Sequence, residues 1–66
     1  MKKVDNVINY KNEKYIIINS TVFLGNKYIF VINLNSIQDV KLLVCLNKLE
    51  EVDDIELIRK VLLQMK

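Results

Sequence analysis

The sequence contains no histidine, no proline and no tryptophan, and it has one glycine and one cysteine. Histidine is the commonest general base and the commonest metal ligand in proteins, so this chain lacks the usual means of catalysis and of metal binding. The single glycine excludes the glycine-rich loops that cradle phosphates in nucleotide-binding proteins. We therefore expect that the protein is not an enzyme, and that it has no catalytic residue, no cofactor and no metal.

The one cysteine, Cys45, lies between Val44 and Leu46 in an apolar run. A single cysteine cannot form an internal disulfide, and an unpaired thiol is typical of proteins from a reducing compartment. No base stands near it in the sequence. We interpret Cys45 as a small apolar residue of a strand and not as a catalytic thiol.

Long hydrophobic runs are also missing, because the longest are far below the ~20 residues that span a bilayer. Met1-Lys2-Lys3 resembles the charged start of a signal peptide, but Asp5 and Asn6 interrupt any apolar run after it. We expect a cytoplasmic protein without membrane contact. Its length predicts one small domain over residues 1–66.

Neither sign of charge dominates, since ten basic residues stand against eight acidic ones and give a net charge of +2. This excess is too small to indicate a nucleic-acid or membrane surface. Acidic residues gather at Glu50, Glu51, Asp53 and Asp54, without the alternating spacing or the glycine of a calcium loop. We attribute them to helix capping and solvation.

The centre of the chain, residues 15–34, consists of two runs rich in isoleucine, valine and aromatic residues, joined at Gly25-Asn26. A glycine-asparagine pair between such runs predicts a β-hairpin, because its tight turn needs positive φ. The turn predicts that Leu24 lies opposite Lys27. If Asn12-Glu13 forms a similar loop, Tyr10 lies opposite Tyr15.

The remaining periodicity predicts strands over residues 4–10, 15–24, 27–34 and 39–46, a polar loop over 47–52, and a helix from about residue 54 to the C-terminus. Short connections favour neighbouring strands. We therefore expect an α+β fold: an antiparallel four-stranded meander sheet with one C-terminal helix packed on one face. The polar residues Asn19-Ser20-Thr21 are a candidate bulge, which would shift the register.

The expected helix is amphipathic. Asp53 stands three residues before Glu56, in a variant of the capping box. The apolar stripe comprises Ile55, Leu57, Ile58, Val61, Leu62 and Met65. Leu63 falls in the polar arc, either as a single exposed leucine or as a contact with another molecule.

Both faces of the central hairpin are apolar, whereas one helix covers only about two strands. We assign the helix to the aromatic face because that face has the larger apolar set, which comprises Val4, Ile8, Tyr10, Ile17, Phe23, Phe30 and Ile32. The opposite face then stays exposed, and an exposed apolar sheet is an aggregation hazard unless a partner covers it. The predicted partner-binding residues are Ile16, Ile18, Val22, Leu24, Ile29 and Val31, together with Leu63.

These features support two hypotheses. The first is a small protein-interaction module without enzymatic activity, which binds a copy of itself as a homodimer or a regulatory or host target, for example as an inhibitor. The alternative is a small nucleic-acid-binding regulator that uses its lysines and stacks bases on Tyr10, Tyr15, Tyr28 and Phe30. The lysines are dispersed along the chain, which favours the first hypothesis.

The segment Phe23-Leu24-Gly25-Asn26-Lys27-Tyr28 matches an F-x-G-x-x-Y turn, and it is followed by another strand and an acidic-capped helix. This order resembles the YrzB-like family of small uncharacterised bacterial proteins, over roughly residue 15 to the C-terminus. The resemblance implies a small cytoplasmic α+β protein and brings no active-site residue.

Overall fold

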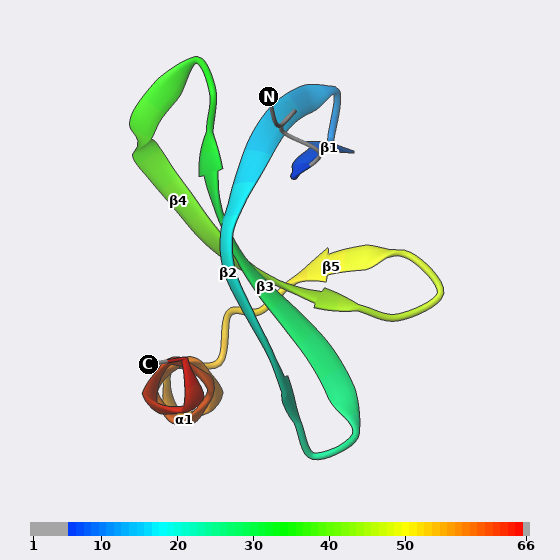
Figure 1. The fold of residues 1–66 in the computed structure, drawn as a ribbon, viewed down its shortest axis with the longest axis vertical. Helices are drawn as coiled ribbons and strands as arrows, with labels where there is room; N and C mark the ends of the chain where they lie inside the picture. Colours follow the sequence, from blue (N-terminus) through cyan, green and yellow to red (C-terminus); the bar gives the residue numbers. More distant parts are fainter. Residues whose placement is uncertain (1–5, 66) are drawn as a thin grey trace, which may run out of the picture.

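The structure is a computed structural model that describes residues 6–65 (Figure 1). The elements are β1 (Val7–Tyr10), β2 (Glu13–Phe23), β3 (Asn26–Asn33), β4 (Ser36–Cys45), β5 (Leu49–Glu51) and α1 (Ile55–Gln64). The five strands form one antiparallel sheet in sequential order, which curls into a half-barrel. The predicted α+β meander with one C-terminal helix is confirmed.

The sheet has five strands and not the predicted four. Residues 49–51, read from the sequence as part of a polar loop, pair with β4, where Leu49 lies opposite Cys45 and Glu51 opposite Leu43. An edge strand with only one apolar side chain gives almost no periodic signal, which is why the sequence did not reveal it. The first strand begins at Val7, and the predicted start at Val4 lies outside the described residues.

Both early hairpins turn one residue sooner than predicted. Phe23 lies opposite Asn26, so the loop is Leu24-Gly25, with φ of 53° and 84°. The first loop is likewise Lys11-Asn12, with φ of 52° and 66°. A turn of this type requires positive φ at both central positions. Leu24 and Lys11 therefore adopt a left-handed conformation, next to Gly25 and Asn12, and glycine and asparagine tolerate that conformation well.

β2 contains a bulge between Ile17 and Asn19, where Ile18 is the additional residue, one position before the polar segment 19–21 at which the sequence predicted it. Side chains alternate between faces, so one inserted residue exchanges the faces of everything before it. Tyr15 and Ile17 therefore lie on the face opposite Phe23. The predicted single aromatic face is wrong for this reason.

The bulge divides the apolar residues into two cores on opposite faces of the sheet. The inner core lies within the curl and contains Tyr10, Tyr15, Ile29, Val31 and Leu43, with Ile8, Ile17, Cys45 and Leu49 packed around them. The outer core lies between sheet and helix and contains Tyr28, Leu42, Val52 and Val61, with Phe23, Phe30, Val44, Leu57, Ile58 and Met65 around them. The curl therefore covers the face that the sequence left for a partner.

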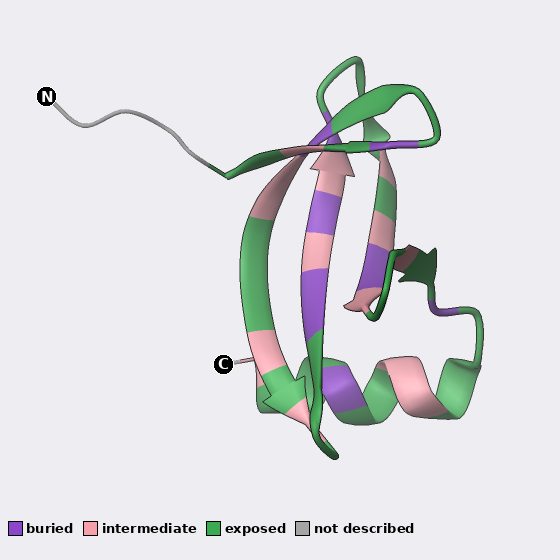
Figure 2. Ribbon diagram, turned by 90° about the vertical axis from the view of Figure 1, so that its right-hand side faces the viewer, coloured by how far each residue is buried: buried purple, intermediate pink, exposed green. Residues whose placement is uncertain are grey.

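The helix α1 lies across one end of the sheet (Figure 2). Its N-cap is Asp54, one residue later than predicted, and the carboxylate accepts hydrogen bonds from the N–H groups of Glu56 and Leu57. Val61 is buried, whereas Ile55 and Leu62 of the predicted stripe are exposed, because the helix meets only the end of the sheet. Within residues 6–65, no helix combines the length and the hydrophobicity needed to cross a membrane.

Candidate functional site

The seven predicted partner-binding residues do not form one surface. Ile29 and Val31 are buried in the inner core, and the expectation that they lie on an uncovered face is wrong. Val22 and Leu24 are exposed near the tip of the β2–β3 hairpin, Ile18 is exposed at the bulge and Ile16 is half-buried. Leu63 is exposed on α1.

A different apolar surface is present on the outer face of the sheet. The register places Val7 opposite Ile16, Ile16 opposite Ile32, and Ile32 opposite Val40. Directly opposed residues share a face, so these four side chains form a row across β1, β2, β3 and β4, here called the outer row. Val7 and Val40 are exposed, Ile16 and Ile32 are half-buried, and none of the four belongs to either core.

The outer row borders the helix without being covered by it. Ile32 is two residues beyond Phe30, and Val40 is two residues before Leu42, which are both packed in the outer core. The row is therefore the next one along the same face, at the end of the sheet away from α1 (Figure 2). The outer row is thus a band of branched aliphatic side chains that spans four strands and is only partly shielded from water.

A polar cluster lies at the same end of the sheet, on the inner face. The Tyr15 hydroxyl donates to Asp39 Oδ2 at 3.0 Å, and Asn33 Nδ2 donates to the same oxygen at 3.2 Å. Asn33 also donates to Glu13 and accepts from the Asn35 N–H at 2.7 Å. Asn33 is buried and its side chain has partners at both ends, so the cluster closes the β3–β4 turn and, within residues 6–65, no buried side-chain nitrogen or oxygen is left unpaired.

Lys41 completes this cluster. Its Nζ lies 3.1 Å from Asp39 Oδ1, 4.0 Å from Glu51 Oε1 and 5.8 Å from the centre of the Tyr15 ring. The hydrogen bond from Lys41 lowers the pKa of Asp39 below its ordinary value of 3.8, and the same bond raises the pKa of Lys41 above 10.5. Each group stabilises the charged form of the other, which indicates a structural pair.

The pair should make the fold sensitive to strong acid. A carboxyl whose pKa is lowered by folding contributes stability that is present above its unfolded pKa of 3.8 and is lost as pH falls through the lower folded value. Lys41→Met removes the main cause of the lowered Asp39 pKa. The difference between the urea midpoints of wild type and variant should therefore shrink as the pH falls from neutral to about 2. An unchanged difference between the two midpoints over that range would contradict this assignment.

A cleft opens between the two edge strands of the half-barrel. It has a volume of about 640 Å³ and is lined by Asn9, Tyr10 and Lys11 on one side and by Lys48, Leu49, Glu50 and Glu51 on the other. Lys11 Nζ stands 5.7 Å from the centre of the Tyr10 ring. This cleft could not be predicted from the sequence, because β5 itself was not predicted.

The predicted aromatic platform for bases is absent from the described structure. Tyr10 and Tyr15 are buried in the inner core, whereas Tyr28 is buried on the other face beside Phe30. A base can stack only on an exposed ring, so these residues cannot act together as the sequence suggested. Cys45 is half-buried beside the inner core, as an apolar residue would be.

Across residues 6–65 the structure brings together no group of three or more cysteine or acidic side chains that could hold a metal ion. No protein-family model, no curated protein and no solved structure matches the chain. The resemblance to the YrzB-like family stays a prediction, and the geometry of the chain carries the functional argument.

Proposed function

We propose that this protein is a small, non-enzymatic interaction module that binds a protein through the outer row. The observation that supports the proposal is the alignment of Val7, Ile16, Ile32 and Val40 across four neighbouring strands, beyond the reach of the helix. Isolated exposed apolar residues are common, but a contiguous apolar band on a sheet is typical of a binding surface.

The position of the helix explains why the band is left uncovered. α1 has ten residues, and at 1.5 Å per residue it is ~15 Å long. Four strands at ~4.8 Å spacing extend over a similar width, but α1 lies over one end of them only. A second apolar body is needed to remove the outer row from water, and this chain has no further element among its described residues to supply it.

The partner is a second copy of this chain or a different protein target. A symmetric dimer through one shared patch is the commonest closed assembly. A regulatory or host protein, which this chain would inhibit by covering part of its surface, could make the same apolar contact with the outer row. We place this activity in the cytoplasm, since the one thiol has no disulfide partner. Nothing observed favours the alternative of nucleic-acid binding over protein binding.

Val40→Glu should therefore abolish self-association or partner binding without unfolding the chain. Val40 is 47% exposed, so a charge there remains hydrated in the monomer but is desolvated against an apolar partner. The loss should be at least about tenfold in the dissociation constant, since burying an aliphatic side chain contributes ~1.5–3 kcal/mol. Light scattering over a concentration series, and affinity for any purified partner, measure it.

The matched control is Val22→Glu. Val22 is 67% exposed, belonged to the surface that the sequence predicted, and lies at the opposite end of β2 from the outer row. It should leave binding unchanged. Loss of binding in Val22→Glu with retention in Val40→Glu would contradict the assignment of the outer row.

A further inference from the structure

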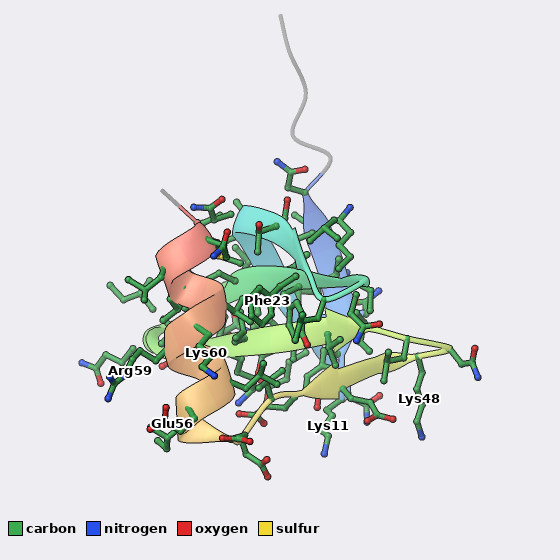
Figure 3. All side chains as sticks on the ribbon, turned by 90° about the horizontal axis from the view of Figure 1, so that it is seen from below. Lys11, Phe23, Lys48, Glu56, Arg59 and Lys60 are labelled. Carbon is green, nitrogen blue, oxygen red and sulfur yellow. The ribbon has the colours of Figure 1, made fainter. Side chains whose placement is uncertain are left out.

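The side of α1 that faces the outer row is apolar. Figure 3 views the molecule from the end at which α1 lies, and Lys60 stands on the near side of the helix. Successive residues of an α-helix are about 100° apart, so Leu62 lies about 200° from Lys60, on the far side. Ile55 shares the side of Leu62, because seven residues make almost two full turns. Ile55 is 73% exposed and Leu62 is 38% exposed, so both remain accessible on the side that faces the outer row.

The uncovered part of the sheet face is about as wide as a helix. Beyond Ile32 the same face continues to Leu34, which is 47% exposed and whose N–H donates to Lys14 O at 3.0 Å. The outer row together with Leu34 is here called the free strip. Alternate residues of a strand are ~6.8 Å apart, so two such rows extend over roughly 13 Å. An α-helix with its side chains is ~10–12 Å wide, so the free strip has room for one helix beside α1.

One apolar residue of α1 has no contact to make within its own chain. Leu63 lies about 200° around the helix from Val61, which is buried against the sheet, so Leu63 points away from the sheet and is 62% exposed. Glu56 and Arg59 share this outward side, but they are opposite in charge and three residues apart, within reach of each other. Arg59 can also lay its aliphatic stem along an apolar surface. The outward side of α1 can therefore meet such a surface without burying an unpaired charge.

We propose that the free strip of each chain binds α1 of a second copy, so that two chains form a symmetric dimer with their helices side by side between the two sheets. Leu63 of each copy then contacts the outer row of the other, and Ile55 and Leu62 contact the other helix. The inference rests on the proposed function and commits it to one partner, a second copy of this chain. One contact covers the outer row and the three large apolar residues that α1 exposes.

The symmetry of the dimer follows from this packing. A two-fold axis that exchanges the two sheets and also places the helices side by side must run along the helices, between them. Such an axis preserves the direction of each helix, so the two helices are parallel and identical residues face each other across it. The contact is isologous, which is the commonest kind in dimers.

The buried area favours a second copy over a partner that supplies only a helix. With its ten residues, α1 is ~15 Å long, so half of its surface together with the strip beneath it amounts to about 500 Å². A specific interface needs about 1,000 Å² or more. A two-fold dimer makes the same contact twice and reaches that area, whereas one foreign helix does not.

Sedimentation equilibrium of the purified chain tests this assembly. Wild type should be a dimer, and Leu63→Glu and Val40→Glu should each raise the dissociation constant at least tenfold, because each places a carboxylate against an apolar surface. The matched control is Gln64→Glu, which adds the same charge at the next residue of α1. Gln64 is exposed and shares the side of Lys60, four residues before it, so this variant should leave the dimer unchanged. Circular dichroism confirms that each variant is folded.

A disulfide tests the parallel arrangement. Leu62→Cys in a Cys45→Ala background should form an intermolecular disulfide under mild oxidation, because the two copies of residue 62 face each other across the axis. In the same background, Leu24→Cys is the control. Leu24 is 81% exposed at the β2–β3 turn, at the opposite end of the hairpin from the outer row, and it should form no such disulfide.

Three results would overturn the proposal. They are a wild-type monomer at millimolar concentration, a dimer that Leu63→Glu leaves intact, and a Leu62→Cys chain that dimerises without forming the disulfide. The outer row itself is judged by Val40→Glu. If wild type is a monomer and Val40→Glu loses a different protein, only the second copy is wrong as the partner. If the dimer resists both Val40→Glu and Leu63→Glu, the dimer forms elsewhere and the outer row fails with it.

Discussion

Val31→Lys should leave the protein unfolded at neutral pH. Val31 is 0% exposed in the inner core, and it lies opposite Ile17 on one side and Lys41 on the other. The substitution loses ~1.5–3 kcal/mol of apolar burial. It also places an ammonium group out of water beside a second lysine, which costs several kcal/mol more.

The sum exceeds what a domain of this size can lose, because a core this small rarely supplies more than ~3–5 kcal/mol of stability. Circular dichroism and the dispersion of amide proton resonances measure the outcome. Val22→Lys is the control, since it introduces the same charge at an exposed position of β2 and should leave the fold intact. A folded Val31→Lys variant with normal stability would show that the inner face is open to solvent and that the curl does not close it.

Asn33→Leu should destabilise the fold by about 2–3 kcal/mol, although leucine is more apolar and similar in size. Asn33 is buried and bonds Glu13, Asp39 and the Asn35 N–H through one side chain. Leucine removes these hydrogen bonds, two of which are made to carboxylates, and a hydrogen bond to a charged group contributes ~1.5–3 kcal/mol.

Urea denaturation of Asn33→Leu and wild type measures this difference. Asn47→Leu, at an exposed position between β4 and β5, is the matched control and should change the midpoint little. Equal or greater stability of Asn33→Leu would mean that the polar cluster does not hold the β3–β4 turn.

The sequence predicted the fold where its patterns were long. The apolar run of residues 27–34, the two tight turns and the capped amphipathic helix near Asp54 were all identified, with turn or cap positions in error by one residue. Local propensity determines such elements, so a local pattern is enough to find them.

The candidate surfaces could not be predicted to the same extent, because they depend on the bulge at Ile18 and on the pairing of β5. One inserted residue moved Tyr15 and Ile17 to the inner face and aligned Ile16 with Ile32 on the outer one. The polar residues 19–21 indicated a bulge without its position, and the side-chain pattern does not decide the register because both faces of the hairpin are apolar. The sequence therefore indicated that an apolar surface exists without indicating which residues form it.

We propose that this chain binds another protein through the outer row. Site-specific photocrosslinking tests it directly, with a photoreactive amino acid placed at Val40 or at Val22 in the living source cell. Both positions are exposed, so the reactive group is accessible in either case. We expect a discrete crosslinked protein, either a second copy or another target, from position 40 and none from position 22. Crosslinks from position 22 without any from position 40 would contradict it.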